Sequence, residues 1–179
     1  MMDSNLLVNA LLWGPLMAAS LHIFEEFVWP GGFLQWYLKY RENPKTVNRN
    51  FLLLINAALL LALLTGAMAG RRERSVALLL TISALLFANG CWHIWASYKS
   101  HSYSPGTITG TLLYLPLGVF EYLSWIRLQE ASVGTAVFAV IIGWLYPLWS
   151  ANYHKRRKPN LERRQTTSSA VQAHSCSMR

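Results

Sequence analysis

Acidic residues and cysteines are scarce in this sequence. Only 8 of its 179 residues are Asp or Glu, against 16 Lys and Arg, and charged residues make up 13% of the chain. The two cysteines, Cys91 and Cys176, suit neither a disulfide scaffold nor a cysteine-based zinc site. Most Lys and Arg lie between long apolar stretches or in the tail after residue 154, where they act as topology signals at anionic lipid. We therefore expect no nucleic-acid partner.

Long apolar stretches dominate the rest of the chain. Hydrophobic residues make up 53% of the sequence, and a membrane-spanning helix needs about 20 mostly apolar residues. The stretches that reach this length are residues 5–28, 51–70, 75–98, 107–125 and 132–153. The sequence therefore predicts an all-α fold, a polytopic membrane bundle of about five transmembrane helices.

The segments between these stretches indicate the topology. Residues 33–40, FLQWYLKY, are too short to span a membrane and mix aromatic with basic side chains, so we expect an interfacial segment there. Lys and Arg are more numerous on the side of the tail, which places the C-terminus in the cytoplasm. We assign residues 1–154 to the transmembrane domain of a multi-pass integral membrane protein. Residues 155–179 are expected to form a basic, disordered cytoplasmic tail.

The first apolar stretch ends in three polar side chains. His22, Glu25 and Glu26 stand at i, i+3 and i+4, so on a helix they crowd one face. Ionisable groups at membrane depth are costly to hold and are by default candidates for function. This segment is therefore the first place to look for a site.

A second histidine is expected at the same depth. The first and third stretches run in the same direction, because one complete span separates them. At a rise of 1.5 Å per residue, His22 and His93 lie about 10 and 8 Å below the same membrane surface. Asn89 is one turn from His93 on the same helix face. We expect one polar layer formed by His22, Glu25, Glu26, Asn89, His93 and, from the following loop, His101.

Two further features have more than one interpretation. Glu121 either lines the inner end of a substrate cavity or lies near the opposite membrane surface. Residues 103–107, YSPGT, have the composition of a turn followed by a helix start. The exposed N–H groups of that start either follow a plain turn or bind an anionic group.

Two kinds of chemistry fit the polar layer. Two or three imidazoles with one or two carboxylates suit a divalent metal such as Zn, Fe or Mn. Without a metal, a buried Glu and a His can act as acid and base and isomerise or cyclise a lipophilic substrate. A third interpretation gives these residues only a structural role.

An ordered set of motifs runs through most of the chain. HIFEE at residues 22–26 is followed by WPGG at 29–32, NGCWH at 89–93 and YSPG at 103–106, with Thr109 shortly after. This set resembles the HXXEE-domain membrane proteins. The resemblance implies a small integral membrane protein with His22, Glu25 and Glu26 as motif residues of a suspected active site, and it supplies no reaction.

We predict a membrane enzyme that acts on a lipophilic small molecule entering from the membrane lipid. Its metal ligands are predicted to be His22, His93 and Glu25 or Glu26. The other Glu serves as general base, and Asn89 assists catalysis by orienting a ligand. The alternatives are a metal-free isomerase or cyclase and a non-enzymatic transporter or structural membrane subunit.

Overall fold

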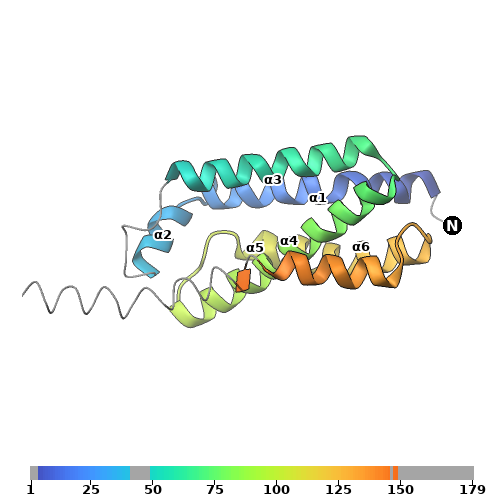
Figure 1. The fold of residues 1–179 in the computed structure, drawn as a ribbon. Coiled ribbons are helices and arrows are strands. Elements are labelled where there is room, and N and C mark those ends of the chain that lie inside the picture. The colour runs from blue at the N-terminus through green and yellow to red at the C-terminus, as the bar shows by residue number, and fades with distance from the viewer. Residues whose placement is uncertain (1–3, 41–48, 146, 149–179) are drawn as a thin grey trace, which may run out of the picture. The chain divides into compact units, whose positions relative to one another are not determined.

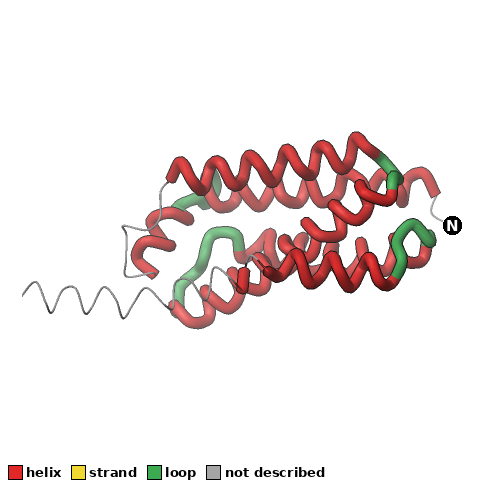
Figure 2. Tube along the Cα trace, viewed as in Figure 1, coloured by secondary structure: helices red, strands yellow, loops and turns green. Residues whose placement is uncertain are grey.

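The computed structural model describes residues 4–40, 49–145 and 147–148, and within these ranges the chain is helical and contains no strand (Figure 2). Its contacts divide the chain into two units, residues 1–144 and 145–179. The helices labelled in Figure 1 belong to the first unit: α1 (Ser4–Phe27), α2 (Phe33–Tyr40), α3 (Arg49–Ala69), α4 (Glu73–Ser100), α5 (Thr107–Thr109) and α6 (Leu115–Arg127). The π-helical segment η2 (Gly110–Tyr114) connects α5 to α6. The all-α fold class is confirmed, whereas the predicted tail, residues 155–179, lies outside the described residues.

In the described part of the chain, three helices are long and apolar enough to cross a membrane. They are Asn5–Phe27 within α1, Arg49–Ala69 and Glu73–Ser100, and they coincide with the first three predicted spans. The fourth predicted span is helical over residues 107–127 but is divided into α5, η2 and α6. The next apolar helix is described over Val133–Leu145, and this described part is shorter than a membrane crossing requires. The count of about five spans therefore stays a prediction.

The surface of α3 is typical of a helix that faces lipid. Its exposed side chains include the large apolar residues Leu53, Leu54, Leu61, Leu64 and Met68. A helix that is apolar on its packed face and also on its exposed face suits a membrane rather than water. The apolar stretch predicted at residues 51–70 thus forms a helix with the lipid-facing surface that a membrane span has.

The core lies between α1, α3, α4 and α6. α1 packs along α3, and α4 packs against η2 and α6 (Figure 1). The fully buried side chains of this core include Leu11, Leu63, Leu79, Leu80 and Trp125. Arg71, in the turn between α3 and α4, forms an ion pair with Glu130, in the turn after α6. These turns therefore lie together at the start of α4. The predicted site residues of this helix, Asn89 and His93, lie toward its other end.

A contact between two glycines brings η2 against α4. A Cβ built on Gly90 would lie 2.9 Å from the carbonyl oxygen of Gly110, so neither position has room for a side chain. The π-helical turn that begins at Gly110 precedes Pro116, whose missing N–H interrupts the α-helical bonding pattern in any case. The close approach and the π turn together set where residues 104–114 meet α4.

The short helix α2 covers the end of α4. It spans Phe33–Tyr40, the segment predicted to be interfacial. The ring of Phe33 is buried, with its centroid 5.6 Å from that of His93 and 6.3 Å from that of Trp92. Trp36 Nε1 donates a hydrogen bond to Ser102 Oγ at 3.0 Å. α2 is thus attached both to α4 and to the loop that follows it.

Candidate functional site

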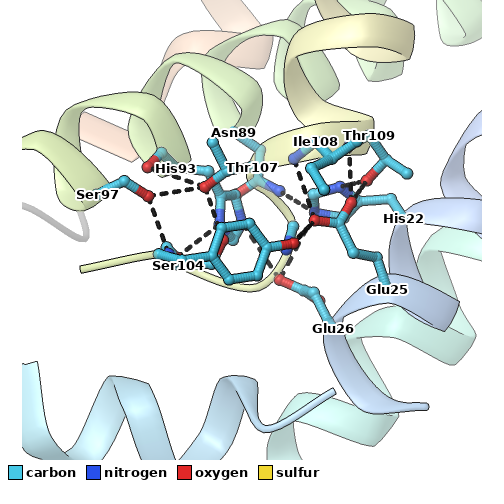
Figure 3. Close-up of polar contacts among 12 residues, drawn as sticks. His22, Glu25, Glu26, Asn89, His93, Ser97, Ser104, Thr107, Ile108 and Thr109 are labelled. Carbon is cyan, nitrogen blue, oxygen red and sulfur yellow. Dashed lines mark hydrogen bonds and ion pairs between the residues drawn. The ribbon is translucent and has the colours of Figure 1, made fainter. Parts of the chain in front are cut away.

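His22 and Glu26 on α1 meet His93 on α4 (Figure 3). Glu26 Oε1 lies 3.5 Å from His22 Nε2 and 3.2 Å from His93 Nε2. The imidazole rings touch edge to face, with centroids 4.9 Å apart. The three residues are only 2%, 6% and 1% exposed, and one ligand atom from each lies within 4.8 Å of the others. We call these three residues the His/Glu cluster.

The His22 ring is held on three sides. Nδ1 lies 2.8 Å from the Thr109 hydroxyl oxygen, and Nε2 lies 3.2 Å from Asn89 Nδ2. The ring of Tyr114 lies against its face, with a centroid distance of 4.4 Å and a tilt of 32°. These contacts, from α4, α5 and η2, leave the ring little freedom to turn.

His93 is bound through one ring nitrogen only. Nδ1 lies 3.1 Å from Ser104 Oγ. Nε2 is buried and has no hydrogen-bond partner among the described residues, although Glu26 Oε1 lies 3.2 Å away. A buried polar atom without a partner costs free energy, and in native proteins it calls for an explanation such as a bound ion, a water or a catalytic role. The unpaired nitrogen faces the centre of the His/Glu cluster.

Glu25 points away from the cluster, into the start of α5. Its Oε1 accepts hydrogen bonds from the backbone N–H groups of Gly106 at 2.9 Å and Ile108 at 3.0 Å, and from the Tyr103 hydroxyl. Its Oε2 accepts from the N–H of Thr109 at 2.7 Å and from the hydroxyl of the same residue. The anionic group that these helix-start N–H groups bind is thus the chain's own Glu25.

Tyr103, in the loop outside the spans, donates to this carboxylate. Burial raises the pKa of the Tyr103 hydroxyl, and the hydrogen bond to Glu25 and its negative charge raise this pKa further. The phenol therefore stays protonated at physiological pH and remains a donor.

The loop over residues 101–106, which we call the site loop, is pinned to α4 by hydroxyl groups. Ser97 Oγ lies 2.8 Å from Thr107 Oγ1 and accepts a hydrogen bond from the N–H of Ser104 at 2.9 Å. Thr107 Oγ1 also donates to the carbonyl of Ser104 at 2.6 Å. These bonds hold Ser104 beside His93.

Other predicted polar residues lie outside the cluster. Asn89 contacts it through His22, as described above. His101 ends α4 with φ 48°, and its ring centroid is 6.5 Å from that of Tyr98. Glu121 is fully buried in α6, where Oε2 accepts a hydrogen bond from Trp125 Nε1 at 3.0 Å. Among the described residues, the group with metal-ligand geometry is His22, Glu26 and His93.

Several contacts of the cluster carry no distinctive signal in the sequence. The sequence places Ser104 only in a turn before a helix start, and Thr109 only beside a motif. Tyr114 and Phe33 were not assigned to the site. The order of the motifs indicates that residues 103–109 belong to the site. Which of them contacts which ring nitrogen depends on the fold of the site loop.

The cluster can hold a cation between three ligand atoms. Two imidazole nitrogens and one carboxylate oxygen form a donor set that Zn(II), Fe(II) and Mn(II) accept in proteins. Outer hydroxyl groups on Nδ1 of both rings are the kind of support that ligating histidines have. In place of a cation, a proton shared by Glu26 and an imidazole would also give Glu26 Oε1 and the facing Nε2 atom a bonding partner.

Comparison with known proteins identifies the family. Neither the curated proteins nor the solved structures contain a match to this chain. A family model described as a protein of unknown function with an HXXEE motif matches residues 13–121, which is more than half of the chain and includes the whole His/Glu cluster. The chain therefore belongs to the HXXEE family.

Proposed function

We propose that this chain is a multi-pass integral membrane enzyme that binds one divalent metal ion in the His/Glu cluster. The observation that carries the proposal is the buried Nε2 of His93, which has no hydrogen-bond partner in the described part of the chain and lies 3.2 Å from Glu26 Oε1. His22 Nε2 faces the same oxygen at 3.5 Å. A carboxylate and two ring nitrogens brought this close in a buried place need a cation or protons to balance them.

The ligands in this proposal are His22, Glu26 and His93. Both oxygens of Glu25 already accept hydrogen bonds from the segment 103–109, so we assign the ligating carboxylate to Glu26. Asn89 Nδ2 contacts His22 Nε2 at 3.2 Å. With that nitrogen bound to a metal, the Asn89 N–H would be released to hydrogen-bond an oxygen of a bound water or substrate. A bound divalent metal would act as a Lewis acid or lower the pKa of a bound water.

The surroundings favour a lipophilic small molecule as substrate. At this end of α1 and α4, the exposed side chains include the large apolar residues Phe24, Val28, Trp29, Trp95 and Tyr98. Phe33 and Trp92 form an apolar wall beside His93. A molecule dissolved in the membrane lipid would meet these side chains before it met the cluster.

The test is the metal content of the purified protein. We expect close to one metal ion per chain after loading with Zn(II), and loss of that ion in His22→Ala, His93→Ala and Glu26→Gln. His101→Ala is the matched control, because it removes a histidine that lies outside the cluster. Equal metal content in all four variants would refute the site.

A second candidate is acid–base catalysis without a metal. It is favoured by the position of Glu26 Oε1, which is within 3.5 Å of an Nε2 atom on each histidine and so suits a shared proton. Wild-type protein that takes up no metal, but loses activity on a lipophilic substrate in Glu26→Gln, would favour such an isomerase or cyclase. A cellular function that survives Glu26→Gln and His93→Ala would instead favour a transporter or a structural subunit.

A further inference from the structure

The Thr109 hydroxyl lies between Glu25 and His22 (Figure 3). Its oxygen is 2.5 Å from Glu25 Oε2 and 2.8 Å from His22 Nδ1. An ionised carboxylate only accepts hydrogen bonds, and a hydroxyl has a single hydrogen to donate. Thr109 therefore donates to Glu25, and the hydrogen in its bond with His22 has to come from Nδ1 of the ring.

This order of donors selects one tautomer of neutral His22. With the hydrogen on Nδ1, the Nε2 atom carries a lone pair, and this atom lies 3.2 Å from Asn89 Nδ2 and 3.5 Å from Glu26 Oε1. We propose that Glu25 and Thr109 are positioning residues that act through His22. They hold its Nδ1–H in a bond with the hydroxyl and present the Nε2 lone pair to the His/Glu cluster.

His93 has no equivalent chain of donors. Its Nδ1 lies 3.1 Å from Ser104 Oγ, and no carboxylate bonds to that hydroxyl among the described residues. Ser104 can donate to this nitrogen or accept from it. The two rings therefore differ: Thr109 fixes the hydrogen of His22 on Nδ1, whereas Ser104 leaves both tautomers of His93 open. Glu26 Oε1, 3.2 Å from His93 Nε2, favours the hydrogen on that nitrogen in the metal-free protein.

The link to metal affinity rests on the proposed function, but the tautomer of His22 does not. Outer-shell partners of ligating histidines usually change metal affinity by about 10–100-fold when they are removed. The tautomer is a property of the protein without metal. The His22 tautomer and the metal affinity can therefore be measured separately on the same variants.

The variants differ at one hydroxyl. Thr109→Val removes the hydroxyl with little change of shape, and Thr109→Ser keeps it. Thr111→Val makes the same change at an exposed position one residue beyond Gly110 and serves as the matched control. Glu25→Gln is less suitable alone, because Glu25 also anchors residues 103–109 and its loss can unfold that segment.

The tautomer is read from nitrogen NMR of metal-free protein labelled with ¹⁵N-histidine, because protonated and unprotonated ring nitrogens resonate far apart. The His22 signals are assigned by their loss in His22→Gln. We expect the hydrogen on Nδ1 in the wild type, in Thr109→Ser and in Thr111→Val, and a mixture of tautomers in Thr109→Val. An unchanged His22 tautomer in folded Thr109→Val would overturn the proposal.

Metal affinity is read from titration with Co(II), whose visible absorption reports its ligands. We expect Thr109→Val to bind Co(II) about 10–100-fold more weakly than the wild type, with Thr109→Ser and Thr111→Val close to it. If the wild type binds no Co(II) but the tautomer shifts in Thr109→Val, the metal site is refuted and the positioning role stands. If the wild type binds Co(II) and Thr109→Val binds it equally well, the positioning role is refuted and the metal site stands.

Discussion

Gly106 lies directly against the rings of both histidines. A Cβ atom built on it would be 2.6 Å from His93 Cε1 and 2.8 Å from His22 Cε1. Its φ of +102° is also one that residues with side chains rarely adopt. The backbone of the site loop, and not a side chain, therefore closes the cluster on this side.

Gly106→Ala is expected to disrupt the cluster. Of the two costs, the positive φ alone contributes about 1–2 kcal/mol, and the clash with the rings of His22 and His93 adds to it. Gly70→Ala is the matched control, because Gly70 has φ +70° and nothing within 4 Å of its Cβ position. We expect thermal unfolding in detergent to show a larger loss of stability for Gly106→Ala, together with loss of Zn(II) uptake. Equal losses in the two variants would contradict the contact.

Glu25→Gln is expected to loosen the start of α5. A glutamine presents an NH₂ group to donors, so at least one of the N–H groups of Gly106, Ile108 and Thr109 loses its acceptor. Hydrogen bonds to charged groups contribute about 1.5–3 kcal/mol, so amide hydrogen exchange in residues 106–109 should speed up about tenfold or more. Glu26→Gln is the control at the neighbouring position, and similar exchange in both variants would contradict the assignment.

Metal addition is expected to stabilise the folded protein. A ligand at 100 times its dissociation constant adds about 2.7 kcal/mol of stability when it binds only the folded state. We expect Zn(II) to raise the unfolding temperature of the wild type, and EDTA to reverse the rise. Neither reagent should shift Glu26→Gln, which keeps the shape of the side chain and loses its charge. A shift of the same size in that variant would place the ion elsewhere.

Phe33→Ala is expected to open the cover over His93. The Phe33 ring is buried, and its centroid lies 5.6 Å from that of His93. Removal of this ring should raise the rate at which diethyl pyrocarbonate modifies His93 several-fold, and mass spectrometry maps the modified residue. His101 provides an internal reference, and Trp29→Ala, at a residue that is 73% exposed, provides the matched variant. Unchanged labelling of His93 would show that α2 does not limit access.

Glu121 is expected to contribute to stability and not to metal binding. Glu121→Gln keeps an oxygen acceptor for Trp125 Nε1, so we expect little change. Glu121→Ala leaves that buried N–H unpaired, at a cost of about 1–3 kcal/mol. Both variants should retain Zn(II), because Glu121 is not part of the cluster. Loss of metal from Glu121→Gln would contradict this separation.

The helices were largely predictable, because apolar runs of membrane-spanning length leave the backbone few alternatives. Residues 33–40 were predicted as a segment separate from the first span, since Pro30, Gly31 and Gly32 stop α1, and the short helix Phe33–Tyr40 lies there. Its place at the membrane interface stays a prediction. The break of residues 107–127 into α5, η2 and α6 was not predicted. Pro116 marks a local interruption of the helical bonding, but the contact of Gly110 with Gly90, which accompanies the π turn, has no local pattern that reveals it.

The site was predictable in composition but not in its division of roles. Equal depth and helical spacing predicted that His22 and His93 approach each other. Glu25 and Glu26 both lie one turn after His22 and flank its position around the helix axis. The spacing therefore could not tell which of them faces the other histidine. That choice depends on the N–H groups of Gly106, Ile108 and Thr109, which reach Glu25 only after the site loop has folded back.

The hydrogen bonds between Glu25 and residues 103–109 tolerate mutation differently on the donor side and on the acceptor side. Three of its donors are main-chain amides, which every residue except proline supplies, so a new side chain at Ile108 leaves its bond intact. The acceptor side of all these bonds is a single carboxylate. Among these donors, variation can therefore accumulate at Ile108, but not at Gly106, which has no room for a side chain, or at Thr109, whose hydroxyl is also used. The acceptor side depends wholly on the glutamate at position 25.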